Sequence, residues 1–182
     1  MAKVYAGIGS RTTPADIQKL MSRAALLLSH EGWKLRSGGA PGADLAFQDG
    51  ISGRSDLWAF QEIFIPWNGF SNLHHNPEKG IYFTPKNTAA EAIAEAHHPA
   101  YDKLGKAAKK LMCRNGYQIL GLELNNPASF VLCWTPDACI NGCTIQETGG
   151  TGQALRIAHN YGIPIYNLAY KPHYDKVVNW VK

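Results

Sequence analysis

The sequence predicts an α/β fold, with a doubly wound and mostly parallel β-sheet covered by helices on both faces. Short apolar runs of strand length alternate with stretches of helical periodicity, and glycine-rich turns join strands to the helices that follow. Hydrophobic residues make up 45% of the 182 residues and charged residues 18%, which is enough apolar surface for a core. We therefore expect one domain over residues 1–182, with a helical and loop insert over about residues 70–116.

The first expected elements are a strand, a helix and a second strand. Residues 3–8 are typical of a short buried strand, and the following turn ends in Pro14, a residue favoured in the first turn of a helix. The next helix presents one apolar face and ends at Gly32, before a strand over residues 33–36. This apolar face consists of Ile17, Leu20, Met21, Ala24, Ala25 and Leu28.

The middle of the chain is less regular. A glycine-rich turn at residues 37–44 leads into a second helix, and residues 62–65 predict a third buried strand. Residues 70–87 are rich in Asn, His, Pro and Gly, which predicts a loop. Residues 89–114 predict a helix that is interrupted at His97-His98-Pro99.

The sheet is expected to resume in the last third of the chain. Two apolar runs, at residues 118–121 and 130–134, predict strands separated by a turn. A glycine turn at 148–152 opens a helix over residues 153–161, which Gly162 ends. Residues 163–168 predict the last strand, and residues 174–181 predict a short terminal helix.

Composition and charge disfavour several classes of protein. No apolar run approaches the roughly 18 residues of a membrane span, and the first residues lack a secretory-leader pattern, so we expect a cytoplasmic protein without a membrane partner. The net charge of +4 is spread along the chain, which suits a phosphate-bearing ligand better than it suits a nucleic-acid-binding arm. The four cysteines lack the paired spacing of a zinc site, so we predict reduced thiols, no metal and no cofactor.

Three glycine-bearing turns are expected to meet at one edge of the sheet. Each is expected to follow a strand and to lead into a helix, and ligands of open parallel sheets bind beyond the carboxyl ends of the strands. Glycine lets the backbone pass close to a ligand, and helix N-termini present free N–H groups that favour phosphate. The predicted ligand-binding residues of these turns are Gly7, Gly9, Ser10, Arg11, Ser37, Gly38, Gly39, Ala40, Gly42, Ala43, Asp44, Gly149, Gly150, Thr151, Gly152 and Gln153.

Several of the predicted site residues have an alternative role. Trp67 and Trp134 lie near strand ends, where an indole ring can stack on a base, but burial in the core is the alternative for both; Thr135 follows Trp134 and completes the predicted site. Arg11 is placed either to pair with a phosphate or to lie solvated at the surface. Asp44 either stabilises the start of the second helix or accepts hydrogen bonds from a ribose.

Common catalytic motifs are incomplete or absent. Thr12 stands where the dinucleotide-binding motif that begins at Gly7 requires its third glycine, and neither a Walker loop nor a G-x-S-x-G elbow occurs. Glu147 and Asp44 are the candidate catalytic carboxylates, because cleavage of an N-glycosidic bond needs acid or base groups. The adjacent histidines at 74–75 and 97–98 predict surface or capping roles.

At these turns the sequence resembles the SLOG superfamily, a Rossmann-like group that includes the DprA (SMF) proteins, the LOG nucleotide phosphoribohydrolases and sensor domains of bacterial antiviral systems. Gly7-Ile8-Gly9-Ser10-Arg11 is similar to the Gly-Ser-Arg opening of the DprA-like proteins, and residues 37–44 are similar to their Ser-Gly-x-Ala-x-Gly-x-Asp turn. Residues 149–154 and Ile163-Pro164-Ile165 resemble their late Gly-Thr turn, helix and final strand. The resemblance covers most of the chain and implies a Rossmann-like fold, in a small stand-alone version such as bacteriophages encode in bacterial cells.

The resemblance also implies a function. LOG hydrolases carry a Pro-Gly-Gly-x-Gly-Thr-x-x-Glu signature, and aligning its glycines here puts Gln153 at the threonine and Arg156 at the glutamate that serves cleavage. This departure favours a nucleotide-binding protein over a hydrolase. The superfamily implies capture of a nucleotide-derived signal, such as a cyclic ADP-ribose isomer in antiviral sensing, and sequestration requires binding without cleavage.

Two alternatives stay open. One is a LOG-like nucleoside 5′-monophosphate N-glycosidase, with Glu147 or Asp44 as the working carboxylate. The other is a DprA-like single-stranded DNA-binding protein, in which Arg11, Lys34 and Arg36 contact phosphates and aromatic rings stack on bases. The expected partners are therefore a small phosphorylated nucleotide-type ligand or single-stranded DNA. A homo-oligomer is also expected, since relatives commonly pair through helices.

Overall fold

The computed structural model describes residues 3–182 and contains a six-stranded sheet in which every strand pair is parallel. The order across the sheet is β4-β3-β2-β1-β5-β6, so the chain builds outward from β1 on one side and then returns to build on the other. The direction of winding therefore reverses between β1 and β5. The strands are β1 (Val4–Gly9), β2 (Lys34–Ser37), β3 (Gln61–Ile65), β4 (Ile81–Phe83), β5 (Val131–Trp134) and β6 (Ile165–Asn167).

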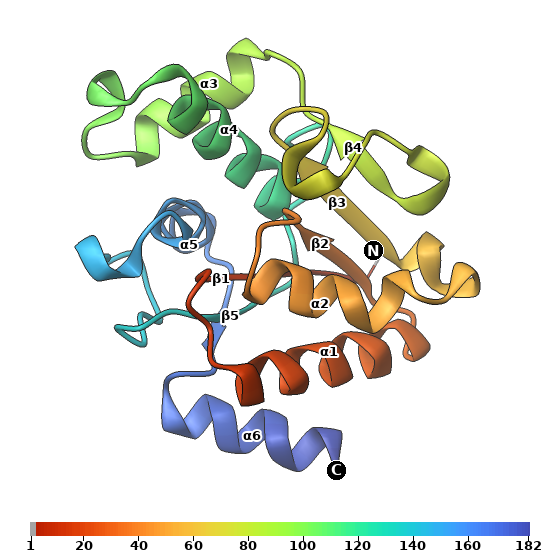
Figure 1. Cartoon of the computed structure of the whole chain (residues 1–182). Helices are drawn as coiled ribbons and strands as arrows, with labels where there is room; N and C mark the ends of the chain where they lie inside the picture. The colour runs from red at the N-terminus through yellow and green to blue at the C-terminus, as the bar shows by residue number, and fades with distance from the viewer. Residues whose placement is uncertain (1–2) are drawn as a thin grey trace.

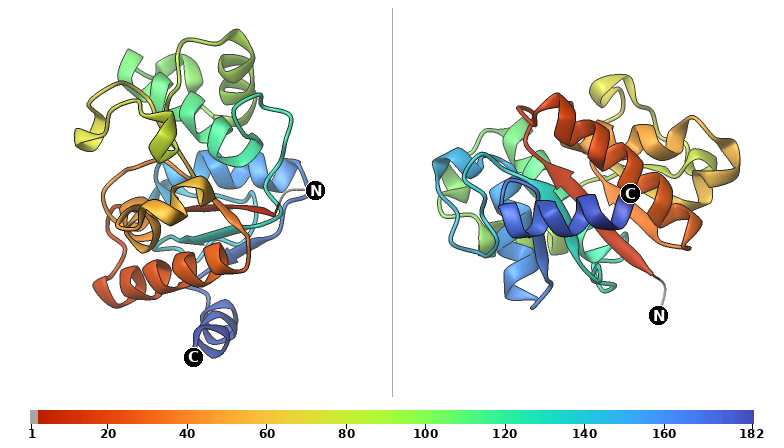
Figure 2. Two further views of the ribbon diagram at one scale, coloured as in Figure 1. Left: turned by 90° about the vertical axis from the view of Figure 1, so that its right-hand side faces the viewer. Right: turned by 90° about the horizontal axis from the view of Figure 1, so that it is seen from below.

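Helices cover both faces of this sheet (Figure 1). One layer contains α1 (Ala15–His30), α2 (Ala43–Ser52) and α6 (Lys171–Val181). The opposite layer contains α3 (Thr88–His97), α4 (Lys106–Leu120) and α5 (Thr151–Asn160). Figure 2 shows α6 beside α1 on the same side of the sheet. Short 3₁₀ turns are η1 (Ser55–Phe60), η2 (Phe70–Asn72), η3 (Pro77–Lys79), η4 (Tyr101–Lys103) and η5 (Gln146–Thr148).

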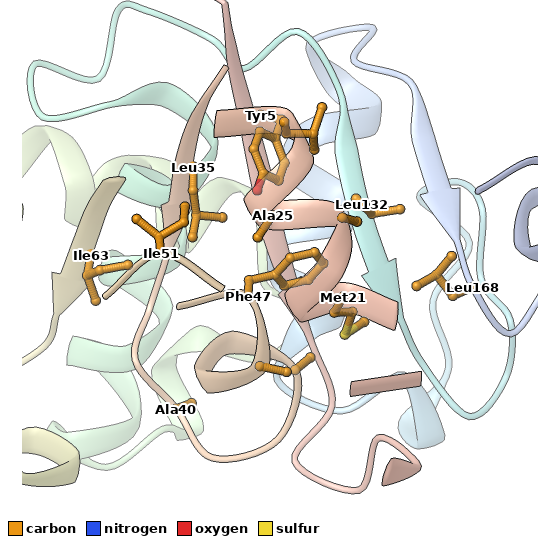
Figure 3. Packing of buried hydrophobic residues seen from close by; sticks show 14 of the residues in the cluster. Tyr5, Met21, Ala25, Leu35, Ala40, Phe47, Ile51, Ile63, Leu132 and Leu168 are labelled. Atoms are coloured by element: carbon orange, nitrogen blue, oxygen red, sulfur yellow. The ribbon is translucent and has the colours of Figure 1, made fainter. Parts of the chain in front are cut away.

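The two faces of the sheet have separate hydrophobic clusters, because successive side chains of a strand point to opposite faces. In β1, Tyr5 joins the cluster under α1 and α2, whereas Ala6 and Ile8 join the cluster under α4 and α5. Figure 3 shows Tyr5, Met21 and Phe47 together in the first cluster. The predicted fold class is therefore confirmed: the protein has a Rossmann-like α/β fold with a parallel sheet between two helical layers.

Two strand predictions differ from the structure. Residues 118–121 are not a strand; Gln118 and Leu120 belong to the last turn of α4. The residues of this turn are all buried, and Leu120 is fully inaccessible. The turn therefore lacks the alternation of apolar and exposed polar residues that marks a surface helix in a sequence. Conversely, β4 lies inside residues 70–87, where a loop was predicted, because it is a three-residue edge strand in a polar segment.

The segment predicted as an insert contributes to the sheet layers. Residues 70–116 include β4, all of α3 and most of α4. The predicted interruption at His97-His98-Pro99 separates α3 from α4, and His97 is the last residue of α3. Within residues 3–182, none of the helices is both long and apolar enough to span a membrane.

Candidate functional site

A cavity of about 270 Å³ lies where the strand order reverses, beyond the carboxyl end of β1. Such a reversal separates the loops on either side of it and leaves a crevice at which ligands of parallel sheets bind. We call it the switch-point cavity. Four segments line it: the end of β1 and its turn, the start of α2, the inner face of α4 and the start of α5. The lining residues are Ile8, Gly9, Ser10, Arg11, Ala40, Asp44, Leu111, Met112, Arg114, Asn115, Gln118, Thr148, Gly149, Gly150, Thr151 and Ala154.

The first two glycine turns are packed directly against each other. A Cβ on Gly42 would be 2.6 Å from the carbonyl oxygen of Ser10 and 2.7 Å from Cα of Arg11, and Gly42 has a φ of +87°. A Cβ on Gly9 would be 2.8 Å from Cβ of Ala43. The Ala43 N–H donates to the Ser10 carbonyl at 3.2 Å. Glycine at positions 9 and 42 thus allows this contact, which brings Ser10, Arg11 and Asp44 to one side of the cavity.

A buried ion pair lies at the wall of the cavity. The Arg114 Nη1 atom on α4 donates to Asp44 Oδ2 on α2 at 3.2 Å, and the two side chains are only 6% and 5% exposed. Arg114 Nε has no hydrogen-bond partner among the described residues. A guanidinium keeps its protons, so Nε remains a hydrogen-bond donor, and buried donors normally have a partner. An acceptor atom of a ligand could supply that partner.

Burial and pairing act in opposite directions on this ion pair. Burial raises the pKa of the Asp44 carboxyl, while the Arg114 guanidinium and the backbone amides of Ala40 and Gly9 oppose that rise. Burial lowers the pKa of Arg114, Asp44 raises it, and the nearby positive charge of Arg11 lowers it further. The cavity wall therefore combines a desolvated carboxylate with two arginines, of which Arg11 is exposed.

The side chain of Gln118 connects the second turn to α4. With its amide oxygen facing the donors, it accepts hydrogen bonds from the Gly38 N–H at 3.0 Å and from Arg114 Nη1 at 3.3 Å. Its amide nitrogen then donates to Asn115 Oδ1 at 3.0 Å. Asn115 in turn donates to the carbonyl oxygen of Gly150 at 3.0 Å. This chain of hydrogen bonds holds the start of α5 in position relative to the second turn.

The N-terminus of α5 presents free N–H groups at the cavity. Gly149 has a φ of +67°, and the helix begins after it without a capping side chain. Neither the Gly150 N–H nor the Thr151 N–H has an acceptor within residues 3–182. Both residues line the cavity, so they form a site with the positive partial charge of a helix N-terminus.

The cavity brings together part of the predicted ligand site. Eight predicted residues line it, from all three turns: Gly9, Ser10, Arg11, Ala40, Asp44, Gly149, Gly150 and Thr151. The sequence predicts that the third turn directly follows a strand, and this prediction is wrong. Residues 135–147 separate the turn from β5. It reaches the cavity because that segment returns to the carboxyl edge before α5 begins.

Other predicted residues support the turns from outside the cavity lining. Gly7 lies within β1, where a Cβ would be 2.6 Å from Leu35, and its carbonyl accepts a hydrogen bond from Ser37 Oγ. A Cβ on Gly39 would be 2.4 Å from Leu73. Gly38, Gly42, Ala43, Gly152 and Gln153 also lie outside the lining.

Both tryptophans and Thr135 lie elsewhere as well. Trp67 packs edge-on against Phe70, with ring centroids 5.2 Å apart. Trp134 is half-buried and packs against the cluster under α1 and α2. Thr135 is buried and accepts a hydrogen bond from Asn167 Nδ2. None of the three lines the switch-point cavity. The contacts of the two tryptophans support packing against the core as their role.

The residues considered for cleavage are also separated from the cavity. Glu147 is exposed and outside the lining. Arg156, at the position of the LOG glutamate, donates to the His97 carbonyl and to Thr144 Oγ1. Gln153 is buried; its amide nitrogen donates to the Ala94 carbonyl and its oxygen accepts from Arg156. These two side chains tie α5 to α3 and to the loop before η5.

Sequence reasoning missed the contribution of α4. Leu111, Met112, Arg114, Asn115 and Gln118 all line the cavity, but this part of the chain was read as a helix end followed by a strand. The available signal was the group of polar residues Arg114, Asn115 and Gln118 shortly before the apolar pair Ile119-Leu120. Polar side chains in a buried helical turn need partners, and those partners often belong to a site.

Two residues proposed for phosphate contact in the DNA-binding alternative lie away from the cavity. Arg36 is 3% exposed and donates from Nε to Glu62 Oε2 at 2.7 Å. Lys34 is paired with the same carboxylate at 3.6 Å. Across residues 3–182, no three His, Cys, Asp or Glu side chains gather in a metal-ligating cluster.

The fold and the cavity define a Rossmann-like α/β protein with a candidate ligand site at its topological switch point. No family model and no curated protein sequence matches the chain. Among solved structures, the DNA processing protein A from Helicobacter pylori, described for its single-stranded DNA binding mode, is similar with a TM-score of 0.58 and 14% identity. The match covers 99% of this chain and 79% of that protein, and it shows a shared fold.

Proposed function

We propose that this chain binds a nucleotide-derived ligand in the switch-point cavity, with a phosphate at the N-terminus of α5. The observation that carries the proposal is the meeting of Arg11 with the unpaired N–H groups of Gly150 and Thr151 at one cavity. A helix N-terminus favours an anion, and an arginine fork matches the geometry of phosphate oxygens.

The buried ion pair gives the rest of the ligand a polar wall. Asp44 is the carboxylate among the lining residues and can accept hydrogen bonds from ribose hydroxyls. The unpaired Arg114 Nε offers a donor to a phosphate or carbonyl oxygen. Leu111 and Met112 supply an apolar surface on which a base can lie.

The ligand is held without cleavage in this proposal. Asp44 is engaged by Arg114, and Glu147 lies outside the lining, so neither carboxyl is arranged as a free acid or base beside the free N–H groups. Binding alone can sequester a signalling nucleotide such as a cyclic ADP-ribose isomer. The SLOG resemblance supports that class of ligand. By holding the nucleotide, the chain would prevent it from reaching an antiviral effector.

Single-stranded DNA is a second candidate ligand. The H. pylori protein of similar fold binds single-stranded DNA, and the exposed Arg11 at the cavity is free to contact a backbone phosphate. A DNA-binding chain loses affinity steeply as salt rises, because each phosphate contact releases counterions. Capture of one small nucleotide depends much less on salt.

A backbone substitution tests the phosphate site directly. Gly150 has a φ of −61°, which proline adopts naturally, so Gly150→Pro deletes one N–H while the helix start is kept. Gly150→Ala is the matched control, because it keeps the N–H and its Cβ would lie 3.9 Å from the nearest atom, Met112 Cε. Equal unfolding free energies of the three proteins would show that the fold is unaffected.

The readout is nucleotide retained by the purified protein, identified by mass spectrometry after filtration and heat release. The panel contains nucleoside monophosphates, cyclic ADP-ribose isomers, cyclic dinucleotides and short oligothymidylates. We expect one intact nucleotide to be retained by the wild type and by Gly150→Ala, and the Gly150→Pro affinity to fall about tenfold or more.

Three results would overturn the proposal. Release of a free base and a sugar phosphate would show a hydrolase, and Asp44→Asn and Glu147→Gln would then identify its carboxylate. Salt-sensitive retention of the oligothymidylate alone would favour DNA binding. Equal affinity of Gly150→Pro and the wild type for every retained compound would place the phosphate elsewhere.

A further inference from the structure

A second cavity, of about 380 Å³, lies on the other side of α4, beyond the carboxyl ends of β3 and β4. Pro66 follows β3 and Phe83 ends β4, and both line it. The opposite wall is the start of α4, with Lys106, Lys109 and Lys110. We call this cavity the lysine groove.

The lysine groove has a strong excess of positive charge. Lys86 completes a set of four lysines in the lining, against Glu91 as the carboxylate there. Glu91 approaches Lys86 at 4.0 Å, and both of these side chains are well exposed. Among the described residues, no carboxylate lies within ion-pair distance of Lys106, Lys109 or Lys110. The start of α4 therefore carries three positive charges that no described carboxylate neutralises.

The same helix end lacks its usual partners. No side chain caps the start of α4, and its first turn contains no acidic residue. The N–H groups of Lys106, Ala107 and Ala108 have no acceptor within residues 3–182. Lys106 is the first residue of the helix, where a positive charge is unfavourable with respect to the helix dipole, so an anion here would offset both the free N–H groups and this charge.

Aromatic rings line the same groove. Phe83 is 39% exposed and lines the groove, so its ring is accessible to a ligand there. Lys109 Nζ lies 4.9 Å from the centre of the Tyr101 ring, a cation–π contact that holds this lysine at the groove. The groove therefore places a flat apolar surface next to clustered positive charge, which is the combination that a ligand with a planar group and phosphates requires.

We propose that the lysine groove is a second ligand site, which binds a small phosphorylated molecule with a planar ring, such as a nucleoside diphosphate. Its phosphates contact Lys106, Lys109 and Lys110 and the free N–H groups of α4, and its ring lies on Phe83. The site is separate from the switch-point cavity, because α4 stands between the two: Met112 and Arg114 line one, and Lys110 and Cys113 line the other.

Isothermal titration with adenosine 5′-diphosphate and with inorganic pyrophosphate tests this site in the full chain. Lys109→Gln/Lys110→Gln removes two charges while keeping residues of good helix propensity, so the variant is expected to fold. Lys171→Gln/Lys176→Gln, on α6, is the control with the same change in charge. Phe83→Leu removes the ring. Gly150→Pro is expected to weaken ligand binding in the switch-point cavity alone.

We expect Lys109→Gln/Lys110→Gln to weaken both probes about tenfold or more, and the α6 control to bind like the wild type. Phe83→Leu should weaken the binding of adenosine diphosphate and leave the affinity for pyrophosphate unchanged. Gly150→Pro should leave this binding event unchanged, which separates it from the proposed function. If the two lysine pairs have the same effect, the binding is unspecific charge attraction and the proposal fails. It also fails if Lys109→Gln/Lys110→Gln binds both probes like the wild type.

Discussion

The guanidinium of Arg114 occupies the space that any side chain on residue 38 would need. A Cβ on Gly38 would lie 1.3 Å from Arg114 Nη1 and 2.5 Å from Cζ. The glycine of the second turn therefore has a steric role, since it admits the arginine that pairs with Asp44. The pattern of glycines in this turn suggests contact with a ligand, but at position 38 the contact is with the protein itself.

Gly38→Ala is expected to expel the Arg114 guanidinium and break its ion pair with Asp44. The loss of a buried pair should lower the free energy of unfolding by at least about 2 kcal/mol. Urea denaturation measures this change. Gly53→Ala, at the end of α2, is the control, because its φ is −70° and nothing lies within 4 Å of its Cβ. A Gly38→Ala protein as stable as the wild type would contradict the steric role.

The two partners of the ion pair should respond differently to substitution. Asp44→Asn leaves a buried guanidinium that cannot lose its proton, and should cost about 3–5 kcal/mol. Arg114→Gln leaves a buried carboxyl, which can take up a proton. Burial already raises the pKa of Asp44, so the Arg114→Gln protein should be most stable at low pH and lose stability as the pH rises through that raised pKa.

Denaturation of both variants between pH 4 and pH 8 checks this asymmetry. The double variant Asp44→Asn/Arg114→Gln should be less destabilised than the sum of the single variants, because neither buried charge then remains. Additive effects, or an Arg114→Gln stability that does not change with pH, would show that the two groups are not coupled.

Asp137 should make the turn before α5 sensitive to acid. Burial raises the pKa of the Asp137 carboxyl, but hydrogen bonds from Thr148, from Thr135 and from backbone amides outweigh it and the pKa is lowered. A carboxyl with a lowered pKa stabilises the fold above its unfolded pKa of about 4, and that contribution is lost as the pH falls through the folded value. Asp137→Asn should therefore be less stable than the wild type at pH 7, with a gap that narrows below pH of about 4. The exposed Asp49→Asn serves as the control in the same titration, and a gap independent of pH would refute the assignment.

Arg36 should matter for stability and not for ligand binding. It joins Glu62 and the carbonyl of Asn126 in a buried position, so Arg36→Gln should cost about 2–4 kcal/mol. Lys34→Gln, which removes a more exposed partner of the same carboxylate, should cost less than about 1 kcal/mol. Both proteins should retain the same nucleotide as the wild type. If Arg36→Gln lost affinity for the ligand while its stability was unchanged, the hypothesis that Arg36 contacts a phosphate directly would be supported.

Local patterns were sufficient for most of the secondary structure. The period of apolar residues in α1 and the glycine and proline signals at its ends predict that helix to within a residue or two. The alternation of strands and helices then predicts a parallel sheet with two covered faces. The pattern failed at the end of α4, where burial on several sides removes the helical period, and at β4, a three-residue strand at the sheet edge.

Local sequence patterns predicted the alternation of strands and helices and the glycine-rich turns, because backbone freedom and hydrophobic period are local properties of the chain. The tertiary structure alone decided which turn residues face the cavity. Asp44 and Arg114 are 70 positions apart, and their contact exists because α2 and α4 approach the same end of β1 from opposite faces of the sheet. Likewise, the segment after β5 carries the start of α5 back to that edge, so that two free N–H groups line the same cavity as Arg11. Contacts of this kind depend on the packing of whole elements, and no local pattern encodes them.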